Sequence, residues 1–156
     1  INRCALIFDL YFMSKLETNM KITGIHRVEL LVEDPATVAD TFNELFDISF
    51  SHDPDTADHG TKCYMAAEAG LELVAPTKPD NTPAQILREK GEGLLTIVLK
   101  VENMEDAKVW AKEKGIGIVY DAEFPCKHRS GVWKQLSLDR NSTHGFMITL
   151  IEEVYD

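Results

Sequence analysis

The chain has 156 residues and a formal net charge of −10 at pH 7. This length allows one domain to bury its own core, and 44% hydrophobic with 27% charged residues is typical of a globular protein, not a disordered one. The acidic balance argues against nucleic acid as a partner, and no apolar run reaches the roughly 18 residues that cross a membrane.

The cysteines and the N-terminal segment indicate where the domain begins and where it resides. Three cysteines are widely spaced and form no CxxC pair, a pattern that favours a reducing compartment, so we expect a cytoplasmic protein. The apolar stretch from Cys4 to Met13 is short and lacks the basic start and cleavage site of a secretory signal. We therefore predict an N-terminal extension over residues 1–19 and one domain over residues 20–156.

The first half of the domain predicts a strand, a helix and three more strands. Apolar and β-branched residues from Ile22 to Val32 indicate a strand, which Asp34 and Pro35 end as they begin a helix. Apolar side chains then recur at helical spacing. Three short strands are expected next, near residues 48–51, 61–67 and 71–75.

The second half repeats this order after a connecting segment. Residues 76–93 contain three prolines and a helical piece over 84–90. A strand over 94–101 precedes an amphipathic helix that begins near Met104 and ends at Gly115. Three further strands are expected near residues 116–120, 132–138 and 146–152.

Two segments align without a gap: RVELLVED from Arg27 to Asp34 and TIVLKVEN from Thr96 to Asn103. One such module cannot bury both its helix face and its sheet face, so two modules must pair. We therefore predict an α+β fold of two βαβββ modules, about residues 21–76 and 93–153. They form a curved, partly open mixed sheet around a central cleft, with the helices outside.

The phrases VELLVEDP, GLELVAP, GEGLLTIVLKVENMEDA and GFMITLIEE resemble the glyoxalase and bleomycin-resistance group, also called the vicinal oxygen chelate superfamily. The resemblance covers about residues 21–153 and implies the fold of that group. Within the group, residues 70–101 are similar to the linker and fifth strand of methylmalonyl-CoA epimerases. Because one scaffold hosts many chemistries, the function depends on the site residues.

The resemblance implies a metal position, which this sequence does not preserve. Enzymes of the group hold a divalent metal with four inward-facing side chains, usually His, Gln or Glu, His and Glu. The matching positions here carry Arg27, Glu72, Thr96 and Thr149. A guanidinium repels a cation, and His26 is expected on the opposite face of its strand because side chains alternate. We therefore predict no metal and no other cofactor.

Strand alternation predicts the side chains that face the cleft. The turn residue His144 is included as a ligand contact, with a solvated loop histidine as the alternative. The loop over 124–131 is either solvated or a lid whose basic residues hold an anionic group. The expected cleft residues on strands are Arg27, Glu29, Glu72, Thr96, Lys100, Trp133, Gln135, Ser137, Met147 and Thr149.

Arg27 and Glu72 allow two interpretations. They form an ion pair that fills the vacated metal position, or Arg27 holds an oxyanion while Glu72 acts as base on a neighbouring C–H group. The second interpretation predicts a metal-independent isomerase or lyase acting on a small oxygenated or carboxylated molecule.

Two further functions stay open. One is a non-catalytic binder of drug-sequestering, bleomycin-resistance type, with Trp133 stacked on a flat ligand. The other is an isomerase similar to methylmalonyl-CoA epimerase. In every case the expected partner is a small molecule, with no nucleic acid and no membrane, and a homodimer is expected from the resemblance.

Overall fold

The computed structural model describes residues 20–53, 56, 59–125 and 130–156. The predicted extension over 1–19 and the centre of the 124–131 loop lie outside the described residues. Within the described part, eight strands form one mixed, curled half-barrel sheet in the order β2-β3-β4-β1-β5-β8-β7-β6. This confirms the predicted α+β class.

The strands are β1 (Ile22–Leu31), β2 (Ser51–Asp53), β3 (Thr61–Ala66), β4 (Leu71–Pro76), β5 (Gly93–Val101), β6 (Ile118–Pro125), β7 (Gly131–Leu138) and β8 (Ile148–Tyr155). The helices are α2 (Pro35–Phe46), α3 (Thr82–Lys90) and α4 (Met104–Glu113), with short 3₁₀ turns η2 (Ala67–Ala69) and η3 (Arg140–Ser142).

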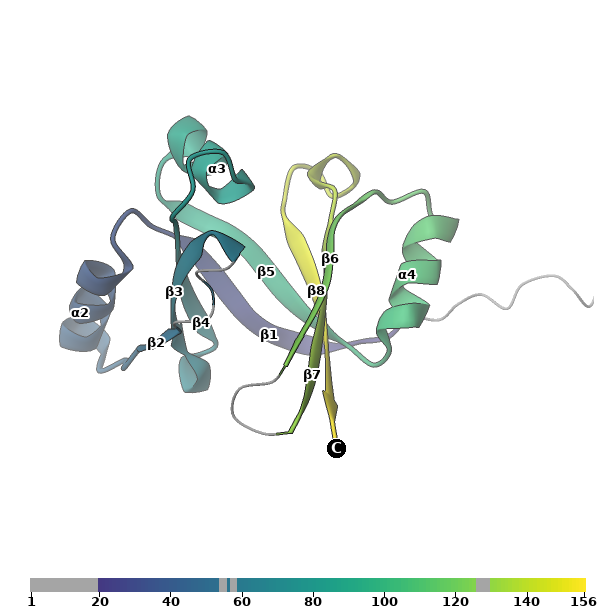
Figure 1. The fold of residues 1–156 in the computed structure, drawn as a ribbon, viewed down its shortest axis with the longest axis horizontal. Helices are drawn as coiled ribbons and strands as arrows, with labels where there is room; N and C mark the ends of the chain where they lie inside the picture. The colour runs from purple at the N-terminus through teal and green to yellow at the C-terminus, as the bar shows by residue number, and fades with distance from the viewer. Residues whose placement is uncertain (1–19, 54–55, 57–58, 126–129) are drawn as a thin grey trace, which may run out of the picture.

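The two halves of the sheet are built alike. β1 pairs in parallel with β4, β5 pairs in parallel with β8, and the antiparallel pair of β1 and β5 joins the halves. Figure 1 shows β1 and β5 crossing the centre, with α2 and α4 on opposite outer sides. The order strand, helix, three strands therefore occurs twice, as the internal repeat indicates.

The predicted strand near 48–51 is misplaced, because β2 covers Ser51–Asp53. Asp47 ends α2 in the left-handed conformation with φ 56°. The chain must then cross from the helix layer to the sheet, and Phe50 packs with the core beneath α2 instead of pairing. Pairing with β3 starts only at Ser51.

Two other strands begin later than expected. Ile116 packs against the core beneath α4, and its N–H donates to Ala111 O at 2.8 Å, so β6 starts at Ile118. Phe146 stays exposed in a turn closed by its N–H, which donates to Thr143 O at 3.1 Å. β8 therefore starts at Ile148.

Capped helices cover the outer face of the sheet. Asp34 caps α2 by accepting from Ala36 N at 3.1 Å, and Asn103 caps α4 by accepting from Asp106 N at 3.0 Å. Beneath α4, Met104 packs with Leu136 and other apolar side chains of β7 and β8. None of the helices in the described residues is long and apolar enough to cross a membrane.

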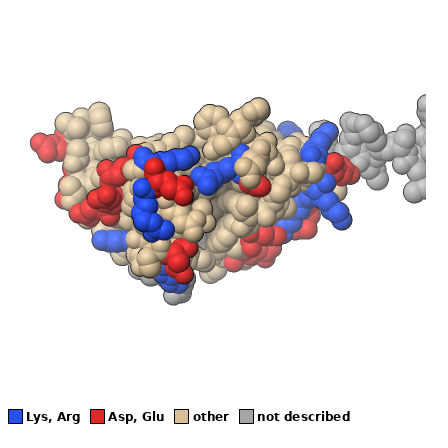
Figure 2. Space-filling model, turned by 90° about the horizontal axis from the view of Figure 1, so that it is seen from above, with Lys and Arg blue, Asp and Glu red and all other residues tan. Residues whose placement is uncertain are grey.

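Charged side chains of both signs lie intermixed on the face shown in Figure 2. Some of the exposed side chains of opposite charge form ion pairs, as do Lys108 Nζ and Asp121 Oδ2 at 3.0 Å. Exposed pairs of this kind contribute little to stability, so the apolar clusters beneath the helices hold the fold.

We predict that Leu73→Ala destabilises the protein by about 2 to 5 kcal/mol, because Leu73 of β4 is fully buried and its truncation leaves a cavity. Leu45→Ala is the matched control, since the Leu45 side chain of α2 is 64% exposed. Urea denaturation measures both free energies of unfolding. Equal losses in the two variants would contradict the packing described here.

Candidate functional site

A cleft with a volume of about 1690 Å³ lies on the concave face of the sheet. Both halves of the sheet contribute to its lining. Of the side chains expected there, Lys100 and His144 do not line it; His144 is exposed in the turn before β8, with φ 55°. The expected residues that line the cleft are Arg27, Glu29, Glu72, Thr96, Trp133, Gln135, Ser137, Met147 and Thr149.

β1 carries a β-bulge at His26. Ile25 pairs with Leu99, and Arg27 pairs with the very next residue of β5, Val98. The extra residue bends the strand, so His26 and Arg27 both line the cleft, and Arg27 Nη1 donates to His26 Nδ1 at 3.1 Å. The expectation that His26 lies on the opposite face is wrong, because alternation holds only while pairing is regular.

Arg27 is the centre of a buried ion cluster. Its Nε donates to Glu72 Oε2 at 2.5 Å and its Nη2 donates to Glu29 Oε1 at 2.7 Å. The Arg27 residue is only 5% exposed. Because Glu29 and Glu72 are paired neighbours on β1 and β4, both carboxylates reach the same guanidinium. The ion pair between Arg27 and Glu72 is therefore present, and Glu29 joins it.

The role of Glu29 in this cluster goes beyond the contact expected from the sequence. The sequence indicates part of this role, since Glu29 lies two residues after Arg27 and is expected on the same face of the strand. Its parallel pairing with Glu72 depends on the sheet register, which the sequence does not specify.

The cluster has unusual electrostatics, because two carboxylates share one guanidinium. Burial raises the pKa of Glu29 to about 7; Arg27 opposes this shift and Glu72 adds to it. Burial alone would lower the pKa of Arg27, but the two carboxylates outweigh it and raise that pKa. One proton therefore binds or leaves the cluster near neutral pH.

His26 links this cluster to one end of the cleft. Burial and then the neighbouring Arg27 lower the pKa of His26, which keeps the imidazole neutral at pH 7. Since Arg27 donates to Nδ1, the ring proton is on Nε2 and faces Glu153 Oε1 at 3.3 Å.

Glu153 stays ionised at that end of the cleft. Burial would raise its pKa, but hydrogen bonds from Lys100 and Tyr155 outweigh burial and lower the pKa of Glu153 to about 2. Lys100 forms an ion pair with Glu153 without lining the cleft itself. Its contact with a ligand stays a prediction.

Trp133 and His26 form an aromatic wall. Their ring centroids are 5.5 Å apart in an edge-to-face arrangement of 81°. The Trp133 indole nitrogen is buried and, within the part of the chain that the structure describes, has no hydrogen-bond partner. The wall thus places the Trp133 ring beside His26, which is itself hydrogen-bonded to Arg27 of the charged cluster.

Three hydroxyl groups form a chain across β5, β8 and β7. Thr96 Oγ1 donates to Met147 O at 3.0 Å, lies 3.2 Å from Thr149 Oγ1, and Thr149 Oγ1 lies 3.0 Å from Ser137 Oγ. Each hydroxyl has one proton, and that of Thr96 goes to a carbonyl. Thr149 therefore donates to Thr96, and Ser137 donates to Thr149.

The side chains at the four positions that match the metal ligands of the resembling group do not fit a divalent cation. Arg27 is a permanent cation already held by two carboxylates, and the Thr96 and Thr149 hydroxyls bond to one another. Glu72 is the one common ligand type among the four. In residues 20–53, 56, 59–125 and 130–156, no group of three His, Cys, Asp or Glu side chains is arranged around a metal position.

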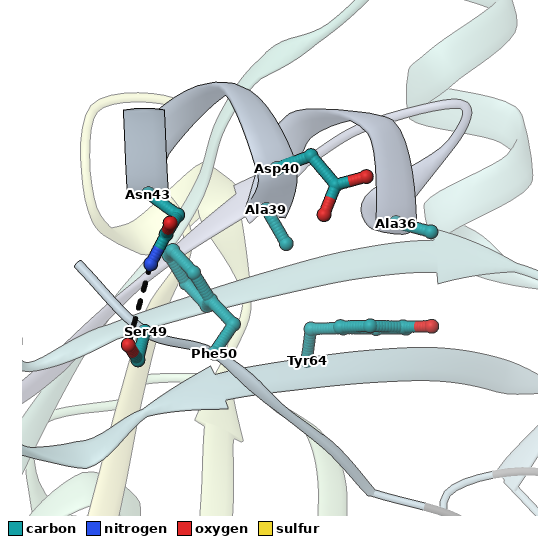
Figure 3. A pocket seen from close by; sticks show the side chains of 7 residues that line it. All are labelled: Ala36, Ala39, Asp40, Asn43, Ser49, Phe50 and Tyr64. Carbon is teal, nitrogen blue, oxygen red and sulfur yellow. Dashed lines mark hydrogen bonds between the residues drawn. The ribbon is translucent and has the colours of Figure 1, made fainter. Parts of the chain in front are cut away.

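A smaller pocket of about 280 Å³ lies between α2 and the strand edge. Figure 3 shows Phe50 and Tyr64 beneath the helix, with Asn43 Nδ2 donating to Ser49 Oγ at 3.3 Å. The aromatic rings belong to the packing beneath α2. Phe50 and Tyr64 thus help to hold the helix on the sheet, and we assign this pocket to packing.

Comparisons with known proteins point to one family. The sequence model described as Glyoxalase/Bleomycin resistance protein/Dioxygenase superfamily matches residues 26–131. None of the curated proteins compared with the chain matches it significantly.

Solved structures share the fold. Methylmalonyl-CoA epimerase from Mycobacterium tuberculosis is 17% identical, with a TM-score of 0.70 over 84% of this chain and 88% of that one. A variant of the Streptomyces coelicolor epimerase in complex with 2-nitronate-propionyl-CoA is 17% identical, with a TM-score of 0.72 over 85% and 98%. A hypothetical protein from Bacillus halodurans C-125 is 19% identical, with a TM-score of 0.70 over 88% and 97%.

The raised pKa of Glu29 predicts a pH-dependent stability. The folded pKa of about 7 lies above the ordinary value of 4.5, so the contribution of Glu29 to stability is complete below about pH 4.5 and is lost as pH rises through 7. The stability of the natural protein relative to Glu29→Gln should therefore fall across this window. Urea denaturation of both proteins from pH 4.5 to 8 measures it, and a constant difference would contradict the shift.

Proposed function

Because the chain belongs to the glyoxalase/bleomycin resistance protein/dioxygenase superfamily, we propose that it is an acid–base enzyme of isomerase or lyase type. Its substrate is a small oxygenated molecule bound in the cleft, and no metal takes part. The observation that carries the proposal is the buried cluster of Arg27, Glu29 and Glu72 on the cleft wall. A buried carboxyl group with a raised pKa in a cleft, as Glu29 has, is typical of catalytic sites.

The two carboxylates act as one acid–base unit. In the ionised cluster, Glu29 or Glu72 takes a proton from carbon beside a carbonyl group: the C–H bond breaks, a carboxyl O–H bond forms, and the electron pair moves to the carbonyl oxygen as an enolate. The pKa of Glu29, about 7, matches proton transfer near neutral pH. Return of the proton to carbon completes an isomerisation.

Arg27 positions this unit. Because its bonds to both carboxylates arise from Nε and Nη2, the guanidinium fixes their orientation toward the cleft. Its charge also offsets the negative charge that develops on the substrate, which is the task of a metal in the resembling enzymes. His26 stays neutral beside it and keeps Arg27 in place through Nδ1.

The fold neighbours favour an isomerase over a lyase. Several are methylmalonyl-CoA epimerases, one of them in complex with methylmalonyl-CoA and NH4⁺. Methylmalonyl-CoA is therefore one candidate substrate. Because the sequences are only 17% identical, smaller carbonyl compounds should be tested beside it.

A non-catalytic binding protein is the second candidate. The aromatic wall of Trp133 and His26 favours it, since a flat ligand can stack there without chemistry. Such a protein returns its ligand unchanged and undeuterated after long incubation in D₂O, and Trp133→Ala weakens binding.

We predict that the protein exchanges solvent deuterium into methylmalonyl-CoA or hydroxyacetone, and that Glu29→Gln and Glu72→Gln each lower the rate by about 100-fold or more. NMR in D₂O measures the exchange. Glu105→Gln is the matched control, since Glu105 is an exposed residue of α4 outside the cleft.

The same assay tests the other parts of the proposal. The rate should rise with pH up to about 7, as Glu29 loses its proton, and treatment with a chelator should leave it unchanged. Full activity in both Gln variants would remove the carboxylate pair from the mechanism. Loss of activity on chelation, with recovery on metal addition, would refute metal independence.

A further inference from the structure

The hydroxyl chain in the cleft offers acceptors instead of donors. The proton of Thr96 goes to Met147 O, that of Thr149 to Thr96, and that of Ser137 to Thr149. All three side chains line the cleft and are at least nine-tenths buried. A ligand at this row therefore meets oxygen lone pairs, which accept hydrogen bonds from it.

The guanidinium of Arg27, on β1 beside the strand that carries Thr96, is already paired with carboxylates. Three of its five N–H groups, one on each nitrogen, are bonded to Glu72, Glu29 and His26. Two carboxylates exceed its single charge, so the fully ionised cluster is negative. A carboxylate ligand at Arg27 would therefore be repelled by the two carboxylates already paired with it.

The remaining charges of the lining are mostly negative. The described residues contribute seven acidic side chains and two arginines, Arg27 and Arg140. Glu153 beside the aromatic wall is ionised at neutral pH, because its pKa is about 2, and it is paired with Lys100, which lies outside the lining. An excess of one sign of charge in a cleft raises the local concentration of ligands with the opposite charge.

We infer that the cleft takes a positively charged ligand that donates hydrogen bonds, an amine carried near a carbonyl group, in preference to a carboxylate or an anionic thioester. This inference deepens the proposed function by naming its substrate class. The charge preference concerns binding alone, and only the reaction of such a ligand rests on the proposed function. Three separate observations support the charge preference: the hydroxyl acceptors of Thr96, Thr149 and Ser137, the pairing of Arg27 with two carboxylates, and the excess of acidic residues in the lining.

A cationic substrate also suits the proposed proton transfer. When a carboxylate of the cluster removes the proton from carbon, one negative charge leaves the cluster and appears on the substrate as an enolate. An ammonium group near that carbon offsets the new charge within the ligand itself. Arg27 then shares this task with the ammonium group, and no metal is required at the enolate.

Three three-carbon ketones of nearly equal size test the inference: aminoacetone, hydroxyacetone and pyruvate, which are respectively cationic, neutral and anionic at neutral pH. Binding is measured by ligand-observed NMR on the full chain, and deuterium exchange into their methyl groups is followed in D₂O. Aminoacetone should bind about tenfold or more tightly than pyruvate, with hydroxyacetone between them.

Variants locate the preference. Glu72→Gln should reduce the ratio of aminoacetone to pyruvate affinity several-fold, and Glu68→Gln, which changes an exposed lining residue, serves if the first variant does not fold. Glu105→Gln, outside the cleft, should leave the ratio unchanged. A similar fall with Glu105→Gln would show a general charge effect and overturn the assignment to the cleft.

The outcomes separate the inference from the proposed function. Preferred binding of aminoacetone without deuterium exchange into any ketone upholds the charge preference and refutes the enzyme. Exchange with equal or tighter binding of pyruvate upholds the enzyme and overturns the charge preference. Tighter pyruvate binding that Arg140→Gln abolishes would assign the cleft to anions, and aminoacetone binding no tighter than pyruvate, including no binding, overturns the inference.

Discussion

The guanidinium of Arg27 between Glu29 and Glu72 is the interaction on which the cleft depends. Three charges are buried on the concave face of one sheet, and a buried charge is tolerated only when it is paired. Removing one partner of such a pair typically costs about 3 to 5 kcal/mol, because the other charge stays in a low dielectric. The cluster thus joins β1 to β4 and also sets the proton affinity of the proposed catalytic group.

The sheet geometry decides which groups meet at this cluster. The bulge in β1 adds His26 to the cleft lining, and His26 in turn connects Arg27 to Glu153 and to the ring of Trp133. On the other half of the sheet, the regular pairing of β7 with β8 aligns Ser137 with Thr149. The row of hydroxyl acceptors therefore begins beside the charged cluster, at Thr96, which pairs with Glu29, and continues across β8 to β7.

The family relationship explains the fold, whereas the proposed reaction rests on the residues of the site. Membership in the superfamily explains the duplicated module and the location of the cleft. Three of the four positions that match the metal ligands of the resembling enzymes carry other residue types here, Arg27, Thr96 and Thr149, and Glu29 adds a second carboxylate beside Glu72. Because one fold hosts many reactions, the proposal for this chain depends on those residues and not on the fold neighbours.

The sequence by itself determined the duplicated modules and, through strand alternation, part of the cleft lining: all the side chains expected on strands line it except Lys100, while others such as Cys63 and Glu153 were not expected. Periodicity and the internal repeat are local signals, so they suffice for these conclusions. The face of His26, the pKa of Glu29 and the direction of the hydroxyl chain were decided only by the tertiary structure. The bulge, the burial and the Met147 carbonyl that accepts from Thr96 all arise from packing between segments that are distant in the sequence.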